Sequence, residues 1–440
     1  MTQSRLLVAN ALLSMQANDG YSNIVIDKAL FESELSARDK AFASNLFYGV
    51  IERRLTLDYI MKKYIRPKLR IKAPVKITLR MGIYQLLYMN SVPDSAAVNE
   101  SVKLVRELGQ PSAAGLVNAV LRSFLRDEKK FTLPDDKITA LSIKYSCDKT
   151  LVSSLIDDYG ENTAEQILQG FENADDSITL RVNTLKTTRE KLLADFEKQG
   201  ISATTVDICD TAIKVKSAGD VRSLYGYKQG LFHVQDVASQ LCAKALSVEG
   251  NMRVLDVCAA PGGKTFSIAE ELGGTGEVVS CDKYEQKVKM ISNGAQRLGL
   301  KNITTLLNDA EKVTRTLGRF DKVLCDLPCS GLGIMAKKPE IRYKNVALLD
   351  NLPKLQYDLL CSSSEYVKSG GMLIFSTCTL RRCENEQVYN KFLETHPDFE
   401  PCDVLIDIER AENQPKNMLT LFPHIHNTDG FFISAFKKKG

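Results

Sequence analysis

The C-terminal half of the chain alternates short β-branched apolar segments with longer amphipathic ones, and this alternation limits the fold more than any other feature. Short runs rich in Val, Ile and Leu predict strands, whereas apolar residues that recur every three or four positions predict helices. Because strands that alternate with helices form a parallel sheet covered on both faces, we predict an α/β Rossmann-like domain over residues 231–440 that ends in the strand FFISAF. The strands are predicted at 253–258, 277–282, 302–307, 321–326 and 372–377, with helices at 284–299 and 352–368.

Residues 1–130 show only the helical pattern. In GLVNAVLRSFLR, residues 115–126, the apolar positions fall on one face of a helix, and VNESVKLVREL repeats the pattern. The charged, proline-containing stretch 127–136 marks the end of this part. Residues 131–230 mix the strand ITLRVNTLK with a capped helix that ends at Gly200 and a second strand, AIKVK. The chain is therefore predicted to be multidomain, with an N-terminal all-α bundle, a small α+β middle module and the C-terminal α/β domain.

The composition is that of a soluble globular protein with free thiols. Of 440 residues, 44% are hydrophobic and 25% are charged, and no run approaches the roughly 18 apolar residues that cross a membrane. The N-terminus lacks the features of a signal peptide. The 11 cysteines are odd in number and form no CxxC pair, and the four histidines do not accompany them at zinc-finger spacing. We therefore expect a cytoplasmic protein with no membrane segment and no metal site.

Positive charge is concentrated in the N-terminal part, although the net charge of the whole chain is only +4. Residues 1–130 carry 20 Lys and Arg against 12 Asp and Glu, whereas the remainder carries 38 against 42. The excess is greatest from Lys62 to Lys76, where seven basic residues occur without an acidic one. Such a run attracts polyanions, and a solvated helix face and loop is the alternative. Together with the segments described next, it favours nucleic acid as a partner.

The segment RVLDVCAAPGGKT combines a strand, a glycine-rich turn and the start of a helix. In open α/β sheets ligands bind beyond the carboxyl ends of the strands, so this turn is a candidate cofactor site. A Walker A loop would need glycine where Cys258 stands, and GxGxxG is also absent. A cofactor without a pyrophosphate is therefore favoured, with a purely structural turn as the alternative. Asp282 closes the next strand, where it can accept hydrogen bonds from ribose hydroxyls, and Asp309 follows the third strand and would lie near an adenine.

Two cysteines follow strand ends at the same predicted edge. Asp326 and Cys329 lie just beyond one strand, in DLPCSG, and Cys378 follows the next, in STC. A thiolate placed there can add to carbon 6 of a cytosine and make carbon 5 nucleophilic toward an electrophilic methyl group. A carboxylic acid such as Asp326 can hydrogen-bond the N3 edge, and a second group must then remove the carbon-5 proton. Most free cysteines are inert buried residues, an alternative that we assign to Cys147, Cys209, Cys242, Cys281, Cys325 and Cys361.

AAPGGKT, DLPCSG and STC, in this order and each at a strand end, resemble the cofactor motif, motif IV and motif VI of the RNA cytosine-C5 methyltransferases. DNA cytosine-C5 methyltransferases resemble the chain only in the proline–cysteine loop, and the N/D-P-P-Y/F loop of amino-methyltransferases is absent. The N-terminal LRMGIYQLLYMNSVPDSAAVNESVKLVRELG and VNAVLRSFLR resemble the NusB-like RNA-binding domain. A NusB-like domain joined to such a methyltransferase is typical of the RsmB (Sun/Fmu) family of 16S rRNA cytosine-C5 methyltransferases. RVNTLK, FHVQDVASQ and TDGFFISAF extend the resemblance over nearly the whole chain.

The resemblance implies a role for each candidate residue. Cys378 would be the nucleophile, Cys329 would assist product release, and Asp326 would be a third catalytic residue. The chain departs from the family pattern at Leu327, where alanine is common, at Thr379, where serine is common, and in YSCDKTLV of the middle module. The methyl donor S-adenosyl-L-methionine, with no metal, would be bound by Cys258, Ala259, Ala260, Pro261, Gly262, Gly263, Lys264, Asp282, Asp309 and Asp326.

The leading hypothesis is an enzyme that forms 5-methylcytosine at one cytosine of 16S rRNA, in RNA that is free or only partly assembled. A base must leave its stack to react, so a single-stranded or loop cytosine is expected. The resemblance implies a monomer with a NusB-like RNA-binding domain at 1–130, an RNA-binding or linker module at 131–230 and a methyltransferase domain at 231–440. Two alternatives are disfavoured: a tRNA cytosine-C5 methyltransferase by the NusB-like part, and a non-catalytic RNA-binding or antitermination-like factor by the intact cofactor loop and both cysteines.

Overall fold

The computed structural model describes residues 2–18, 22–216 and 219–440. The chain forms two units. The helical unit comprises Met1–Asp157 with Lys337–Asn345, and the sheet unit comprises Asp158–Ala336 with Val346–Gly440. None of the helices within the described ranges combines the length and the apolar character needed to cross a membrane. This division reflects which residues pack against one another. The predicted domain boundaries at 130/131 and 230/231 stay predictions.

The helical unit is built around α5, Ala73–Tyr88, which is buried along most of its length. Because α5 contacts α1, α3, α4, α6 and α7, its apolar side chains lie at the centre of the unit's hydrophobic core. The all-helical prediction is confirmed, and the two segments with the clearest apolar period form α6 and α7. The other helices are α1 Thr2–Asn18, α2 Ser22–Phe31, α3 Ala37–Glu52, α4 Arg54–Tyr64, α6 Asp94–Glu107, α7 Ala114–Arg126, α8 Lys137–Lys144 and α9 Lys149–Tyr159, whose last two residues belong to the sheet unit.

A short segment from the C-terminal half, Lys337–Asn345, completes the helical unit. Arg342 is 1% exposed, and its guanidinium lies 3.1 Å from the Glu52 carboxylate. Arg54 stacks on the Tyr343 ring, with 3.7 Å between the guanidinium carbon and the ring centre. A buried guanidinium is retained only where such partners compensate its lost hydration. The segment is therefore an integral part of this unit, which its sequence pattern did not predict.

The first part of the sheet unit is a small antiparallel sheet in the order β2-β3-β1-β4. The helix α11, Arg189–Lys198, begins at the side-chain cap of Thr188 and packs Leu192 and Phe196 against this sheet. The predicted α+β middle module is confirmed. Its strands are β1 Ile178–Val182, β2 Ala203–Thr205, β3 Ala212–Val215 and β4 Phe232–Val234, preceded by α10 Glu161–Glu172.

The larger sheet has the order β10-β12-β9-β8-β5-β6-β7 among the described residues, with β11 paired to β12. β7, β6, β5, β8 and β9 are parallel, which confirms the predicted alternation of strands and helices. β12 is antiparallel to β9, so the complete sheet is mixed. The strands are β5 Arg253–Asp256, β6 Glu277–Asp282, β7 Ile303–Leu307, β8 Phe320–Asp326, β9 Val367–Thr377, β10 Phe399–Cys402, β11 Met418–Leu421 and β12 Phe431–Lys438.

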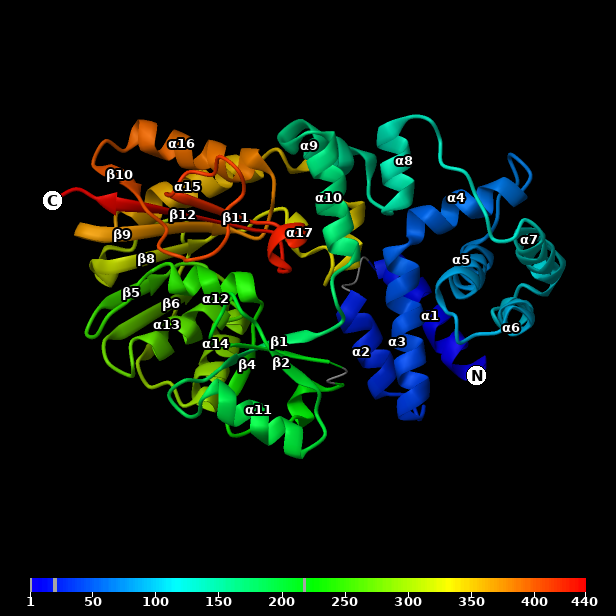
Figure 1. The fold of residues 1–440 in the computed structure, drawn as a ribbon, viewed down its shortest axis with the longest axis horizontal. Helices are drawn as coiled ribbons and strands as arrows, with labels where there is room; N and C mark the ends of the chain where they lie inside the picture. The colour runs from blue at the N-terminus through cyan, green and yellow to red at the C-terminus, as the bar shows by residue number, and fades with distance from the viewer. Residues whose placement is uncertain (1, 19–21, 217–218) are drawn as a thin grey trace. The chain divides into compact units, whose positions relative to one another are not determined.

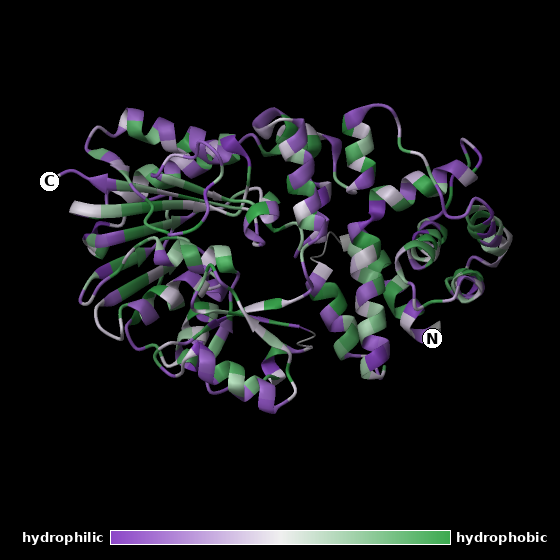
Figure 2. Ribbon diagram, in the orientation of Figure 1, coloured by the Kyte–Doolittle hydropathy of each residue, from purple (hydrophilic) through white to green (hydrophobic). Residues whose placement is uncertain are grey.

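Helices cover both faces of this sheet (Figure 1). Val254 packs with α12, α13 and α14 on one face, and its neighbour Leu255 packs with α15 and α16 on the other. This is the period of two expected of a strand buried on both faces. Figure 2 shows hydrophobic positions concentrated on the central strands. The helices are α12 Val237–Lys244, α13 Gly263–Glu271, α14 Glu285–Leu298, α15 Leu352–Ser364, α16 Glu386–Thr395 and the short α17 Pro423–His426.

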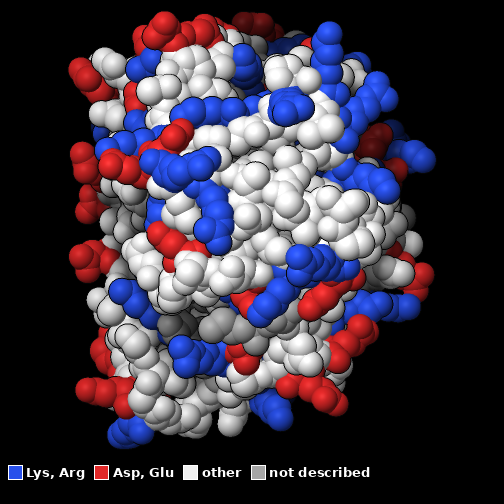
Figure 3. Space-filling model, turned by 90° about the vertical axis from the view of Figure 1, so that its right-hand side faces the viewer, with Lys and Arg blue, Asp and Glu red and all other residues white. Residues whose placement is uncertain are grey.

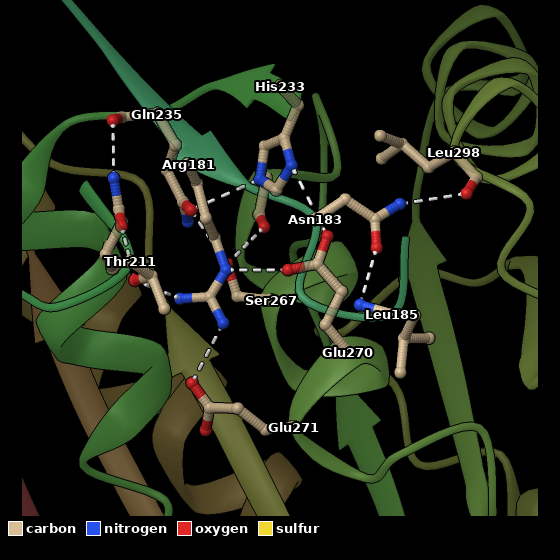
Figure 4. Close-up of polar contacts among 12 residues, drawn as sticks. Arg181, Asn183, Leu185, Thr211, His233, Gln235, Ser267, Glu270, Glu271 and Leu298 are labelled. Carbon is tan, nitrogen blue, oxygen red and sulfur yellow. Dashed lines mark hydrogen bonds and ion pairs between the residues drawn. The ribbon is translucent and has the colours of Figure 1, made fainter. Parts of the chain in front are cut away.

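A buried polar network joins β1 to α13 (Figure 4). Arg181 of β1 is 1% exposed, and its guanidinium lies 2.9 Å from Glu270 and 3.2 Å from Glu271, both on α13. Ser267, one turn earlier on α13, donates to Gln235 at 2.7 Å. Because α13 begins at Gly263, the network fixes the helix whose first turn follows the glycine-rich segment.

His233 belongs to the same network, with its Nδ1 3.7 Å from the Glu270 carboxylate (Figure 4). Burial lowers the pKa of His233 to about 3, and the nearby Arg181 charge acts in the same direction. The imidazole is therefore neutral at physiological pH. Because His233 is uncharged, Arg181 is the cation of this network that pairs with Glu270.

Replacing Arg181 with methionine should destabilise the sheet unit strongly, because the buried Glu270 carboxylate would lose its cation. We expect the free energy of unfolding to fall by about 3–5 kcal/mol, the cost typical of an unpaired buried charge. The control Glu271→Gln removes a carboxylate that is 25% exposed and should cost about 1 kcal/mol. Urea unfolding followed by circular dichroism measures both, and equal midpoints for Arg181→Met and wild type would contradict this role.

Candidate active site

The turn after β5 and the first turn of α13 form the cofactor loop, residues 258–264. Gly262 has a φ of 109°, and a Cβ at this position would lie 2.5 Å from the Phe266 ring. Both facts require glycine. Its N–H donates to the Ala259 carbonyl at 2.7 Å, which closes the turn. Gly262 is therefore needed for this turn and for the close packing of Phe266 against it.

Asp256, the last residue of β5, ties the cofactor loop to the sheet. Its carboxyl accepts a hydrogen bond from the Thr265 hydroxyl at 2.7 Å, and Thr265 shares a second hydrogen bond with Ser280 of β6 at 3.0 Å. Burial raises the pKa of Asp256 to about 7. The three side chains therefore link β5, β6 and α13 directly beside the loop.

Asp282 and Asp309 lie at the ends of the next two parallel strands. Asp282 closes β6 and accepts a hydrogen bond from the Tyr284 N–H at 3.1 Å. Asp309 follows β7 and accepts one from the Glu311 N–H at 3.2 Å. The Asn308 N–H donates to the Asp282 carbonyl at 3.1 Å, which holds the two strand ends together. Both carboxylates therefore stand on the edge of the sheet that carries the cofactor loop.

Asp326 at the end of β8 is held through both carboxylate oxygens. Lys264 of the cofactor loop donates to one at 2.8 Å, and Ser376 of β9 donates to the other at 2.9 Å. Lys264 also lies 3.3 Å from the Ser239 hydroxyl. Although burial by itself lowers the pKa of Lys264, the Asp326 carboxylate more than offsets this and raises it above its usual value. Lys264 is therefore a charged ammonium that connects the cofactor loop to the end of β8.

Cys329 and Cys378 are in sulfur contact. Their Sγ atoms lie 3.1 Å apart, although the residues follow different strands, β8 and β9. The hydrogen bond with Cys378 is the main cause that raises the pKa of Cys329 well above its usual value, followed by burial and by the charge of Cys378. The contact with Cys378 therefore disfavours the Cys329 thiolate.

The structure places the sequence-predicted site residues along one edge of the parallel strands. It brings Asp326 to Lys264 and Cys329 to Cys378. Ser376, which lies on β9 two residues before Cys378, was missed by the sequence analysis. Among the residues that the structure describes, no group of three or more His, Cys, Asp or Glu could hold a metal ion. The expectation that no metal is needed stays a prediction.

Basic side chains gather on the helical unit. Figure 3 shows Lys and Arg around a largely uncharged area on one side of the molecule. In the run from Lys62 to Lys76, Lys63 and Lys76 pair with Asp127 and Asp58. The other five are exposed, and no carboxylate within the described ranges pairs with them: Lys62, Arg66, Lys68, Arg70 and Lys72.

Three known protein families match successive parts of the chain. A family profile described as 16S rRNA methyltransferase RsmB/F matches residues 243–437. The NusB family matches residues 2–126, and the ferredoxin-like domain of RsmF/B-like methyltransferases matches residues 148–222.

Two curated relatives match over nearly their whole length. The probable ribosomal RNA small subunit methyltransferase B of Bacillus subtilis strain 168 is 35% identical and covers 100% of this chain and 99% of its own. The ribosomal RNA small subunit methyltransferase B of Proteus mirabilis strain HI4320 is 31% identical and covers 93% of this chain and 92% of its own. The crystal structure of PH0851 matches with a TM-score of 0.82 at 23% identity, over 99% of this chain and 98% of that one, which supports the fold.

Cys378→Ala should make Cys329 react faster with iodoacetamide near pH 8. Removing the hydrogen bond and the charge of Cys378 lowers the pKa of Cys329, and only the thiolate is alkylated. The pH profile of alkylation, followed by mass spectrometry of the Cys329 peptide, should therefore move to lower pH. The control Cys383→Ala removes a half-buried cysteine nearby in the chain and should leave the profile in place. An unmoved profile in Cys378→Ala would show that the two thiols do not share a proton.

Proposed function

Because this chain belongs to the RsmB/F family of 16S rRNA methyltransferases, we propose that it methylates carbon 5 of one cytosine of 16S rRNA through a covalent adduct between Cys378 and carbon 6. The observation that carries the proposal is the 3.1 Å contact between the Cys329 and Cys378 sulfurs, at the sheet edge that also presents Asp326 and the cofactor loop. A methyl transfer to an oxygen or an exocyclic amine has no use for two cysteines in contact.

The residues at the sheet edge fit S-adenosyl-L-methionine as methyl donor. The cofactor loop, whose turn requires Gly262, lies beyond the carboxyl end of β5, where open α/β sheets bind their ligands. Asp282, one strand away, would accept hydrogen bonds from the ribose hydroxyls, and Asp309, two strands away, would lie near the adenine. When bound, the donor supplies an electrophilic methyl group on a positively charged sulfur.

The first step is the addition of the Cys378 thiolate to carbon 6. The carbon–sulfur bond forms, the ring's electron pair moves toward N3, and carbon 5 becomes an enamine carbon that can attack the methyl group. Asp326 would act at the pyrimidine N3 edge through its pairing with Lys264, which would place an ammonium near the charge that develops there. Carbon 5 would then take the methyl group that a bound donor supplies, and the electron pair of the broken sulfur–carbon bond would remain on the donor's sulfur.

The second step releases the product and assigns a role to Cys329. Adduct formation turns Cys378 into a neutral thioether, which removes the hydrogen-bonded sulfur charge that raised the pKa of Cys329. Cys329 can then lose its own proton to solvent and act as the base. It takes the carbon-5 proton, the electron pair restores the C5–C6 double bond, and the bond from carbon 6 to Cys378 breaks to regenerate the thiolate.

The substrate that fits this chemistry is an unpaired cytosine, because both faces and the N3 edge of the base must be reached. We propose that the RNA is recognised free or partly assembled, in the cytoplasm, by a monomer. The basic run of the helical unit supports RNA binding, because its five exposed cations, which pair with no carboxylate among the described residues, would supply affinity for the RNA backbone without reading its sequence.

The two cysteines should fail in different ways. With 16S rRNA transcript and S-adenosyl-L-methionine, Cys378→Ala should lose methyl transfer completely, because no adduct can form. Cys329→Ala should instead accumulate a protein–RNA complex that survives denaturing gel electrophoresis, because attack proceeds and release does not. The control Cys402→Ala removes a cysteine on β10 and should behave as wild type.

An adduct that accumulated with Cys378→Ala instead would reverse the roles of the two cysteines. Absence of methyl transfer by the wild-type protein to any RNA would overturn the proposed function. The methylated position is identified by nuclease digestion and mass spectrometry of the nucleosides, which separates 5-methylcytosine from N4-methylcytosine.

Replacing Lys62, Arg66 and Lys68 with glutamine should weaken RNA binding mainly at low salt. Each phosphate contact contributes close to one unit to the slope of log K against log salt, and about 0.7 for a single strand. Three lost contacts should reduce that slope by about 2. Filter binding at several salt concentrations measures it, with Lys198→Gln, Lys289→Gln and Lys354→Gln as a charge-matched control on the sheet unit. Equal slopes for the two triple variants would exclude the basic run from the RNA contact.

A further inference from the structure

Both cysteine loops are held by two consecutive buried residues that follow them in the chain. Glu384 ends the short helical turn after Cys378, and Asn385 precedes α16. Both residues are 0% exposed. A carboxylate and an amide are buried only where their hydrogen bonds are made inside the protein, so the partners of these two side chains show what they hold in place.

Glu384 holds the loop that carries Cys329. Its carboxylate accepts a hydrogen bond from the Ser330 N–H at 2.8 Å and another from the Gln356 amide at 3.1 Å. The same Gln356 amide donates to the Pro328 carbonyl at 3.0 Å. The residues on both sides of Cys329 are therefore fixed by Glu384, one directly and one through Gln356.

Asn385 holds the strand end that carries Cys378. Its amide oxygen accepts a hydrogen bond from the Thr377 hydroxyl at 2.5 Å, and its amide nitrogen donates to the Thr379 carbonyl at 3.0 Å. An asparagine at the start of a helix normally caps the helix with its side chain, but Asn385 makes no such bond to α16. Its amide instead forms hydrogen bonds with Thr377 and Thr379, the two neighbours of Cys378.

A further hydrogen bond connects the two loops. The Ser330 and Thr379 hydroxyls lie 2.7 Å apart, one residue beyond each cysteine. The chain on both sides of each sulfur is thus anchored, and the anchors share Glu384 and Asn385. The Gly333 N–H also donates to the Cys378 carbonyl at 2.9 Å, and together these contacts keep the two sulfurs 3.1 Å apart.

Glu384 also contributes a negative charge next to Cys329. After the hydrogen bond and charge of Cys378 and the burial of the thiol, this charge is a further cause that raises the pKa of Cys329. Arg381 faces the same carboxylate at 3.2 Å and reduces the effect without removing it. The charge therefore adds to the effects that disfavour the Cys329 thiolate.

We propose that Glu384 and Asn385 are positioning residues of the two-cysteine site: Asn385 sets the sulfur-to-sulfur distance from the Cys378 side, and Glu384 sets it from the Cys329 side. The proposal rests on the proposed function and deepens it, because it names the residues that hold the two sulfurs in contact. Neither residue touches the reacting atoms.

The distance can be measured without RNA. Diamide takes two electrons and two protons from a pair of thiols in contact, so the rate of Cys329–Cys378 disulfide formation reports their separation. In Asn385→Ala this rate should fall at least about tenfold, because a disulfide tolerates little displacement of its sulfurs. Thr377→Val, which removes only one of the two Asn385 contacts, should show a smaller decrease. The control Glu394→Gln, on the exposed side of α16, should react as wild type.

The effect of the Glu384 charge on the Cys329 thiol can be measured by alkylation. In a Cys378→Ala background, Glu384→Gln should move the pH profile of Cys329 alkylation to lower pH, because a neutral amide no longer disfavours the thiolate. Glu384→Asp keeps the charge and should restore the profile, which a purely structural role of the side chain would not predict. Circular dichroism of each variant shows that the fold is retained.

Unchanged disulfide formation in both Asn385→Ala and Thr377→Val, or equal profiles for Glu384→Gln and its parent, would overturn the corresponding half of the proposal. Both measurements use the protein alone. If they gave the expected changes while wild-type protein methylated no RNA, the positioning roles would stand and the proposed function would fail.

Discussion

The candidate active site depends on the parallel pairing of β8 with β5 on one side and β9 on the other. Each of these three strands ends in a segment to which we assign a part of the proposed chemistry: the cofactor loop, Asp326 with Cys329, and Cys378. Parallel strands end at the same edge and lie about 4.8 Å apart, so three segments distant in sequence become neighbours. The register is specific, because Asp326 lies opposite Ser376 and receives its hydrogen bond. A shift by one residue would turn Ser376 to the other face and leave one Asp326 oxygen without its partner.

Strand pairing alone brings these loops near one another, and buried polar groups then fix them at bonding distance. The Arg181 network stabilises α13 from β1, and Asp256 with Thr265 ties its first turn to β5. On the other side of the site, Glu384 and Asn385 fix the cysteine loops. Such groups cost desolvation free energy and are tolerated only when every partner is in place. The site is therefore supported by interactions that contribute geometry more than net stability.

The fold could be predicted from the sequence because its determinants are local. The period of two in the strands, the helical period between them and the order of the motifs are each visible in short segments, and the structure confirms the α/β domain, the α+β module and the helical bundle. The motifs also indicated which residues would stand at the edge of the sheet. The packing of Lys337–Asn345 into the helical unit was not predictable, because its anchor, the Arg342–Glu52 pair, joins residues far apart in the chain. Glu384 and Asn385 were missed for a related reason: a sequence shows a polar pair before a helix, which suggests a cap, and only the structure shows that Asn385 bonds elsewhere.

The distribution of charge explains why one lysine belongs to the cofactor loop and to the end of β8 at once. Lys264 is a buried cation whose pKa is raised first by Asp326 and also by the neighbouring thiols of Cys242 and Cys378. In the proposed reaction negative charge starts on the Cys378 sulfur, moves to the N3 side of the base when the adduct forms, and is used up when carbon 5 takes the methyl group. On release, the proton transfer to the Cys329 thiolate places negative charge on the Cys378 sulfur again. An ammonium fixed between these positions stabilises the charge at either place without moving, which is the condition for electrostatic stabilisation that requires no reorganisation. Lysine suits this position better than arginine, because its charge is compact and reaches Asp326 from the first turn of α13 with a single donor group.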